Sequence, residues 1–286
     1  MGVTLAALLA TLCLADPDAH GARTVSTGTP AANASSTLPS YDHIVVLLEE
    51  NKSLPEIVGN PLAPYLNSLA TGGASMTQSF GVAHPSEPNY LALFSGSTHG
   101  VSSDTCPVSY PTDNLAHQLA TAGKTFAAFS ESLPSPGYAG CQSGHYRRKI
   151  EPWTDFSNVP ASVSQPLTAM PANYADLPDV SFVVPNLKHD MHSGSIAVGD
   201  RWLAQHIGPY AQWATTHNSL LVVTFDEDDH SAANHIATFL YGAHVTPGND
   251  AEHVTQFSML ATLQALNGLP CLDQSCAARA IADIWH

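Results

Sequence analysis

The chain has 286 residues, of which 44% are hydrophobic and only 12% are charged, enough apolar material for one large or two ordinary globular domains. Its 24 acidic and 9 basic residues give a net charge of −15, which excludes nucleic acid as a partner because no basic surface is left to bind a polyanion. For the same reason, a phosphate group that binds near the carboxylates needs a cation between them.

The N-terminal segment predicts export from the cytoplasm. Met1–Ala15 is an apolar run that is too short to span a bilayer and is typical of the hydrophobic part of a signal peptide. The residues that follow, up to Ser40, are rich in Ala, Ser, Thr, Gly and Pro and predict a flexible spacer. We therefore expect residues 1–40 to be signal peptide and spacer, residues 41–286 to form a single domain, and the protein to be secreted or periplasmic, without stable membrane insertion.

The first predicted strand lies within Tyr41–Asn51, where the apolar run Ile44–Leu48 has no polar alternation, as in a strand buried on both faces of a parallel sheet. Further strands are predicted at Ser75–Val82, Thr125–Phe129, Val180–Val184, Leu220–Phe225 and Ile236–Tyr241. Helices are predicted at Pro64–Thr71, from the N-cap Ser86 through Tyr90–Phe94, at Leu115–Ala122, at Gly199–Thr216 and at Thr255–Leu266. This alternation predicts an α/β fold with a mostly parallel central sheet and helices on both faces. Residues 134–178 lack periodicity and predict a long functional loop or cap.

Four of the five cysteines lie beyond the N-terminal apolar run, which contains Cys13. An even number in an exported chain favours two disulfides, with a local link between Cys271 and Cys276 and a longer one between Cys106 and Cys141. Neither pairing follows from the sequence alone, and a zinc site remains the alternative, although the paired CxxC spacing of such sites is absent.

Polar clusters follow three of the predicted strands. They are Glu49–Asn51, Lys188–His192 and Asp226–Asp229. In a parallel sheet the carboxyl ends of these strands meet at one edge, where open α/β sheets hold their ligands. Ser86 would add a hydroxyl at a helix N-terminus, which is a favourable place for an anion. Oxygen ligands from Glu50, Asn51, Asp226 and Glu227 suit Ca²⁺, Mg²⁺ or Mn²⁺, and Zn²⁺ or Fe if a histidine joins them. Taken singly, each cluster is more often a solvated loop, and Ser86 is by default an ordinary N-cap. Their coincidence at the strand ends is what favours a site.

Several motifs resemble the bacterial and fungal acid phosphatase branch of the phosphoesterase family. They are ENKS at Glu50–Ser53, HPSEPNYLALFSG at His84–Gly96, SFVVPN with DMH within Ser181–His192, HNSLLVVTFDEDD at His217–Asp229 and the turn Tyr241–Ala243. The resemblance extends from about Tyr41 to Leu269. It implies the alkaline phosphatase superfamily fold and makes residues 41–286 a phosphoesterase catalytic domain.

The resemblance also implies roles for single residues. Ser86 would attack phosphorus and form a phosphoseryl intermediate, and His192 would assist the transfer or the leaving oxygen. The substrate contacts would come from His84, Asn89 and Asp190. Glu50, Asn51, Asp226 and Glu227 would hold the divalent ion, with Glu49 behind them or simply solvated. The expected substrate is a small phosphate monoester.

Two alternatives remain open at this point. One is a phospholipase C-like phosphodiesterase, whose choline-binding pocket would use the aromatic residues of the cap by cation–π contact, namely Tyr138, Tyr146, Trp153 and Phe156. The other is a secreted binding protein without catalysis. The sequence leaves the metal, the natural ester, the pH optimum and the oligomeric state undetermined.

Overall fold

The structure is a computed structural model that describes residues 1–2 and 38–286, so the predicted signal peptide, Cys13 and most of the spacer lie outside the described residues. Eight strands form one sheet in the order β10-β2-β9-β8-β1-β7-β3-β6. Their bounds are β1 His43–Glu49, β2 Ala74–Phe80, β3 Phe126–Ser130, β6 Ser164–Pro166, β7 Val180–Val184, β8 Ser219–Phe225, β9 Thr238–Gly242 and β10 Gly248–Thr255. Only β9 runs antiparallel to its neighbours, so the sheet is mostly parallel, as predicted.

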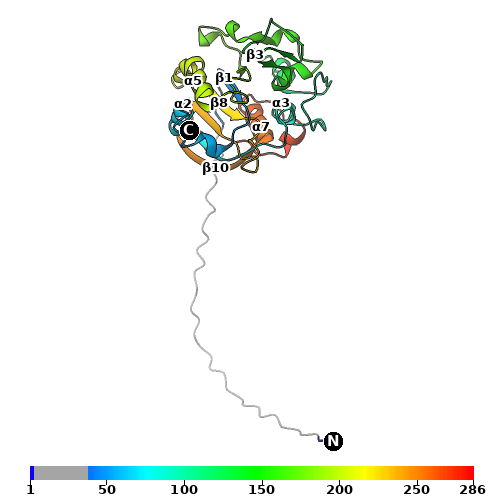
Figure 1. The fold of residues 1–286 in the computed structure, drawn as a ribbon, viewed down its shortest axis with the longest axis vertical. Coiled ribbons are helices and arrows are strands. Elements are labelled where there is room, and N and C mark those ends of the chain that lie inside the picture. Colours follow the sequence, from blue (N-terminus) through cyan, green and yellow to red (C-terminus); the bar gives the residue numbers. More distant parts are fainter. Residues whose placement is uncertain (3–37) are drawn as a thin grey trace, which may run out of the picture. The chain divides into compact units, whose positions relative to one another are not determined.

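Helices cover both faces of this sheet (Figure 1). They are α1 Leu54–Ile57, α2 Pro64–Gly72, α3 Glu87–Ser95, α4 Leu115–Thr121, α5 Ile196–His206, α6 Gly208–Ala214 and α7 Gln256–Leu266. On the central strand β1, Ile44, Val46 and Leu48 pack in the cluster that contains α3, α4 and α7, whereas Val45 and Leu47 pack with α2, α5 and α6. Both faces of β1 are therefore buried, which explains its unbroken apolar sequence.

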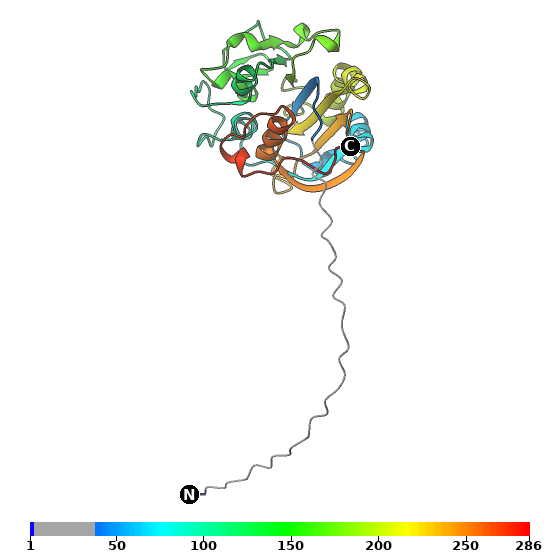
Figure 2. The same cartoon turned by 180° about the vertical axis from the view of Figure 1, so that it is seen from behind.

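The residues between β3 and β7 gather at the β3–β6 side of the sheet (Figure 2). This cap contains the short hairpin of β4 Gln142–Ser143 and β5 Tyr146–Arg147, several 3₁₀ turns and the edge strand β6. Tyr146, Trp153 and Phe156 are buried in it. Three of the four aromatic residues that would have formed a choline pocket are thus part of the core, which removes the specific argument for the phosphodiesterase alternative.

Two of the differences from the sequence prediction have a clear physical cause. The single helix predicted at Gly199–Thr216 is two helices, α5 and α6, because Gly208 and Pro209 interrupt it and a proline inside a helix has no N–H to donate. The sequence pattern does not predict strand β10, because its residues, GNDAEHVT, are mainly polar and half of them are exposed, as fits the edge of a sheet. None of the helices within the described ranges is long and apolar enough to cross a membrane.

The cysteines form two disulfides, Cys106–Cys141 and Cys271–Cys276. This confirms the disulfide prediction and rules out zinc as their partner. The first crosslink joins the segment that follows α3 to the cap.

Candidate active site

The adjacent strands β1 and β8 bring two polar clusters together at their carboxyl ends. Glu49 pairs with Phe225 in the register of the two strands, so the residues that follow each of them are neighbours. Asn51 adopts a left-handed backbone with φ of 55°, which asparagine tolerates better than most residues. Its backbone N–H donates to Asp226 Oδ1 at 3.1 Å, and its Nδ2 donates to Glu227 Oε1 at 3.4 Å.

Strand β7 lies on the other side of β1 and adds the third cluster. The backbone N–H of Glu50 donates to the Asp190 carbonyl at 2.8 Å, and Asp190 Oδ1 accepts the His192 N–H at 2.8 Å. His192 Nε2 lies 3.9 Å from Glu50 Oε2 while its side chain remains 36% exposed, so it faces both the carboxylates and solvent. Between them, Met191 is fully buried with φ of 73°, a strained conformation that fixes the direction of its neighbours.

Ser86 occupies the N-cap position of α3, as predicted, but its side chain does not cap the helix. The hydroxyl donates instead to Glu227 Oε1 at 3.0 Å, and the residue is only 1% exposed. Glu227 Oε2 is bonded to His84 Nδ1 at 2.5 Å, and His84 Nε2 lies 3.3 Å from Asp228 Oδ1. Ser86, Glu227 and His84 thus form one continuous polar chain.

Asn89 has a different position from the one expected of a substrate ligand. Its Oδ1 accepts the backbone N–H groups of Val82 and Ala83, and its Nδ2 donates to the carbonyls of Ala83 and Pro85. All four hydrogen-bonding positions of the amide are therefore used to hold the turn that carries His84 and leads into Ser86.

Several buried acceptor atoms at this edge have no hydrogen-bond partner. They are Glu50 Oε2, Asn51 Oδ1, Asp226 Oδ2 and Asp190 Oδ2. A buried acceptor left unpaired costs about 1–3 kcal/mol, so native proteins rarely keep several together without another group to satisfy them. Burial, with Glu50 and Glu227 close by, raises the pKa of Asp226 well above its usual value, and burial with Glu50 does the same for Asp190. Hard oxygen atoms that lack donors and repel one another are the donor set that a divalent cation requires.

Of the four residues expected to hold the ion, Glu227 alone has both carboxylate oxygens hydrogen-bonded. Glu49 is also buried, at 0% exposure, and burial raises its pKa well above the usual range. Of the two positions expected for Glu49, behind the ligands of the ion or in solvent, burial excludes the second.

Two residues at this edge were not foreseen. Tyr90, on α3, donates its hydroxyl to Glu50 Oε1 at 2.8 Å. Lys149, in the cap, donates to Ser86 Oγ at 3.1 Å and to Asp104 Oδ2 at 2.8 Å, and lies 3.8 Å from Glu50 Oε2. Burial alone would lower the pKa of Lys149, but Glu50 and Asp104 raise it above its usual value, so the ammonium form is favoured. Its only signal in the sequence is that Arg147–Lys149 is a basic run in a strongly acidic chain.

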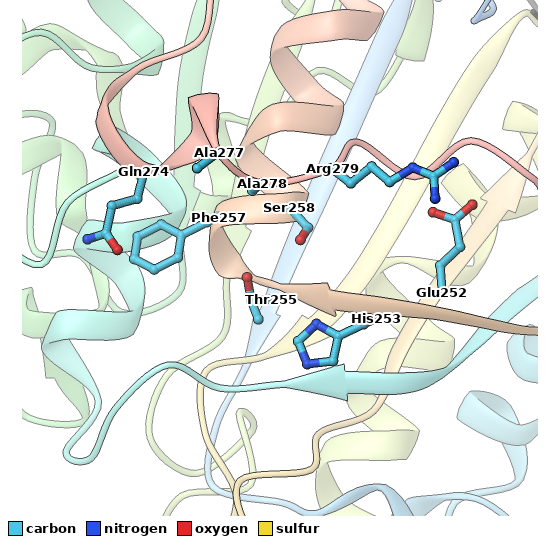
Figure 3. Close-up of a pocket in the computed structure, with 9 residues that line it drawn as sticks. All are labelled: Glu252, His253, Thr255, Phe257, Ser258, Gln274, Ala277, Ala278 and Arg279. Carbon is cyan, nitrogen blue, oxygen red and sulfur yellow. The ribbon is translucent and has the colours of Figure 1, made fainter.

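Two other features lie away from this edge. A groove of about 510 Å³ runs between β10, the start of α7 and the C-terminal segment, with Glu252 and Arg279 at one end and Phe257 and Gln274 at the other (Figure 3). Nearby, ligand atoms of Asp250, Glu252 and Asp283 lie within 4.8 Å of one another. Glu252 uses its carboxylate to accept the N–H groups of Ala282 and Asp283, so it fastens the C-terminal segment. The groove contains none of the candidate catalytic residues.

Comparisons with known proteins identify the family and the fold. The model of the phosphoesterase family matches residues 59–270. A phosphatidylinositol-3-phosphatase of Mycobacterium tuberculosis is 51% identical over 88% of this chain and 85% of its own length. A phosphate-repressible acid phosphatase of Penicillium chrysogenum is 29% identical over 85% of this chain but only 63% of its own length. Among solved structures, an alkaline phosphatase superfamily protein from Vibrio parahaemolyticus aligns with a TM-score of 0.60 and 14% identity over 87% of this chain and 71% of that chain, which shows the shared fold.

Proposed function

Because the chain belongs to the phosphoesterase family and is thus a hydrolase of phosphoric esters, we propose that it is a metal-dependent phosphomonoesterase that forms a phosphoserine on Ser86. The observation that supports this most strongly is the position of Ser86. Its buried hydroxyl is hydrogen-bonded to Glu227 beside a group of unpaired buried oxygens, at the end of three neighbouring strands.

Glu50, Asn51, Asp226 and Glu227 would hold the divalent ion, and the three unpaired oxygen atoms among them fit this role. Oxygen donors favour Ca²⁺, Mg²⁺ or Mn²⁺, with Zn²⁺ or Fe if a histidine takes part. When bound, the ion supplies positive charge that offsets the carboxylates and the phosphoryl oxygens.

The side chains of the protein then account for the transfer. Ser86 Oγ attacks phosphorus, the bond between phosphorus and the ester oxygen breaks, and the hydroxyl proton passes to its acceptor, Glu227. His192 lies at the exposed side of the site, where it hydrogen-bonds the transferring group and protonates the leaving oxygen. Water next attacks the phosphoserine and gives one proton to His192, the bond from phosphorus to Oγ breaks, and Glu227 returns its proton to Oγ, so that phosphate is released and Ser86 is restored. Asn89 contributes by holding the turn before Ser86 rather than by touching the substrate.

We further propose that the substrate is a small phosphate monoester, with the headgroup of a phosphorylated inositol lipid as one candidate. The support is the name of the mycobacterial relative, which shares half of its aligned residues with this chain. Two disulfides favour an oxidising compartment, and together with the N-terminal apolar run they support secretion.

The test compares p-nitrophenyl phosphate with bis-p-nitrophenyl phosphate as substrates, with and without EDTA. We expect cleavage of the monoester only, its loss in EDTA and its recovery with an added divalent ion. Ser86→Ala should lower kcat by at least about 10³-fold. The matched control is Ser95→Ala, since Ser95 is a buried serine of the same helix that bonds the Leu91 carbonyl instead. Faster cleavage of the diester would favour the phosphodiesterase, and an unchanged rate in Ser86→Ala would refute the nucleophile.

A further inference from the structure

We propose that Lys149 is a catalytic residue, whose ammonium group holds the attacking oxygen of Ser86 and stabilises the negative charge that develops on it, and that Asp104 positions this ammonium group. The proposal rests on the proposed function, because it needs Ser86 as the nucleophile. Lys149 lies in the cap, outside the motifs at the strand ends, so the proposal gives the cap a chemical role.

The first argument is the geometry around the Ser86 hydroxyl. Its hydrogen points to Glu227 Oε1 at 3.0 Å, and a lone pair accepts a hydrogen bond from Lys149 Nζ at 3.1 Å. One neighbour therefore takes the proton while the other stabilises the oxygen that remains. Because Lys149 is only 13% exposed, little water competes for this contact, and the charge acts more strongly than it would at the surface.

The second argument is charge balance. Lys149 is the only lysine or arginine within residues 38–286 that pairs with Ser86 or with the carboxylates of the site. The ammonium group of Lys52, although close in sequence, donates to the Asn51 carbonyl instead. In a chain with net charge −15, a single, mostly covered cation against the nucleophile is an unusual placement that a merely structural role does not require.

The third argument is that the surrounding residues hold Lys149 in place. Asp104 Oδ2 accepts from Lys149 Nζ at 2.8 Å, while Asp104 Oδ1 accepts the Glu87 N–H at the start of α3. The disulfide Cys106–Cys141 ties the segment of Asp104 to the cap. Preorganised donors of this kind are worth most in catalysis, because nothing has to reorient when charge develops.

The preceding residue anchors the cap in the same way. Arg148 is buried, pairs with Asp155 Oδ1 at 3.0 Å and donates to the carbonyls of Val108, Ala139 and Thr154. Because the Arg148 side chain is held at several points, the adjacent Lys149 has little freedom to move away from the site.

In the reaction, Lys149 keeps its proton throughout. The Oγ–phosphorus bond forms, the bond from phosphorus to the ester oxygen breaks, and the Ser86 proton goes to Glu227. Lys149 donates a hydrogen bond to Oγ as its negative charge grows and afterwards to the same oxygen in the phosphoserine.

The experiment measures the rate of Ser86 phosphorylation by rapid acid quench and mass spectrometry, at a concentration of the activating divalent ion that saturates the wild type. We expect Lys149→Met to lower this rate by about 10²–10³-fold, with KM changed by less than about threefold. Lys124→Met is the control, because Lys124 is another partly exposed lysine that pairs with a single carboxylate, Asp179, at 3.6 Å. Asp104→Asn should give an intermediate loss in kcat.

A second variant keeps the proposal testable if Lys149→Met folds poorly. Added methylamine should raise the rate of Lys149→Ala by at least about tenfold by supplying the missing ammonium group, and no gain would overturn the proposal. A wild-type rate in Lys149→Met, or a loss that more divalent ion fully restores, would also overturn it, the latter because Lys149 would then act only through ion binding. Full activity in Ser86→Ala would instead refute the proposed function, so the two failures are distinguishable.

Discussion

The hydrogen bond from Tyr90 to Glu50 allows a test of whether Tyr90 holds a candidate metal ligand in place. Tyr90 and Glu50 are both buried, and within residues 38–286 the tyrosine hydroxyl is the only hydrogen-bond donor to the Glu50 side chain, at 2.8 Å from Oε1. The change Tyr90→Phe removes that donor and leaves the ring in place. The carboxylate then keeps Lys149 and His192, whose nitrogens lie 3.8 and 3.9 Å from Oε2.

A hydrogen bond to a charged buried group contributes about 1.5–3 kcal/mol to stability. For a folded domain of this size, such a loss lowers Tm by about 3–12 °C. Groups that orient a metal ligand also change ion affinity or activity by about 10–100-fold when they are removed. We therefore expect Tyr90→Phe to lower both the stability without added metal and the apparent affinity for the activating ion.

The assay combines urea unfolding in EDTA with titration of the activating ion. Tyr146→Phe is the matched control, because Tyr146 makes a similar buried hydrogen bond to Glu151, at 2.9 Å, within the cap. It should lose a comparable amount of stability but keep its ion affinity within about twofold of wild type. Equal effects of the two changes on ion affinity, or no effect of Tyr90→Phe on either quantity, would refute the reasoning.

Three further predictions concern the loops and the cap. In Gly194→Ala the new Cβ would lie 1.8 Å from the Lys188 carbonyl oxygen, so the loop that carries the candidate catalytic histidine must move, and kcat/KM should fall by about 10²-fold in steady-state assays. Replacing Cys106 and Cys141 by serine opens a link between residues 35 apart and should lower stability by about 4 kcal/mol in urea unfolding. Burial raises the pKa of Glu151 to about 7, so the folded state keeps a proton that the unfolded chain loses near pH 4.5. The free energy of unfolding should therefore fall by about 3 kcal/mol as pH rises from 4.5 to 7. Urea unfolding at each pH measures this slope, which Glu151→Gln should remove.

Each of these three predictions has a control and an outcome that would contradict it. Gly208→Ala is the control for Gly194→Ala, because its Cβ would make an ordinary contact with the Tyr65 ring at 3.6 Å. Equal losses in both glycine variants would contradict the steric argument. Opening the Cys271–Cys276 link, between residues 5 apart, should cost about 2 kcal/mol, and a larger effect there than at the long link would contradict the loop-entropy argument. Stability that rises from pH 4.5 to 7, with the same slope in Glu151→Gln, would contradict the assignment of the proton.

The central strands were predictable because their environment is simple. Val180–Val184 matches β7 in full, since a strand buried on both faces needs an unbroken apolar run. The polar edge strand β10 carries no such pattern, and it is held by its pairing with β2, which the local sequence does not encode. Gly208 and Pro209 are residues that often interrupt a helix, but the helical spacing of apolar residues continues across them and predicts a single helix.

The site was predictable where it lies on strand ends. Parallel strands place Asn51 and Asp226 at one edge, and the structure joins them by a hydrogen bond. The contact of Lys149 with Ser86 spans 63 residues and depends on how an aperiodic cap folds back, so neither spacing nor periodicity could reveal it. For Asn89 the motif was misleading. Its position there suggested a substrate contact, whereas its side chain makes all its hydrogen bonds to the backbone of the preceding turn.

The account depends most directly on Ser86 as the residue that receives the phosphoryl group. The decisive measurement is acid quenching during turnover of a phosphate monoester, followed by mass spectrometry of the peptide that contains Ser86. We predict phosphate on Ser86, formed at a rate no slower than kcat and absent in EDTA. Turnover with phosphate on another residue such as His192, or with no phosphoenzyme at any time, would contradict it.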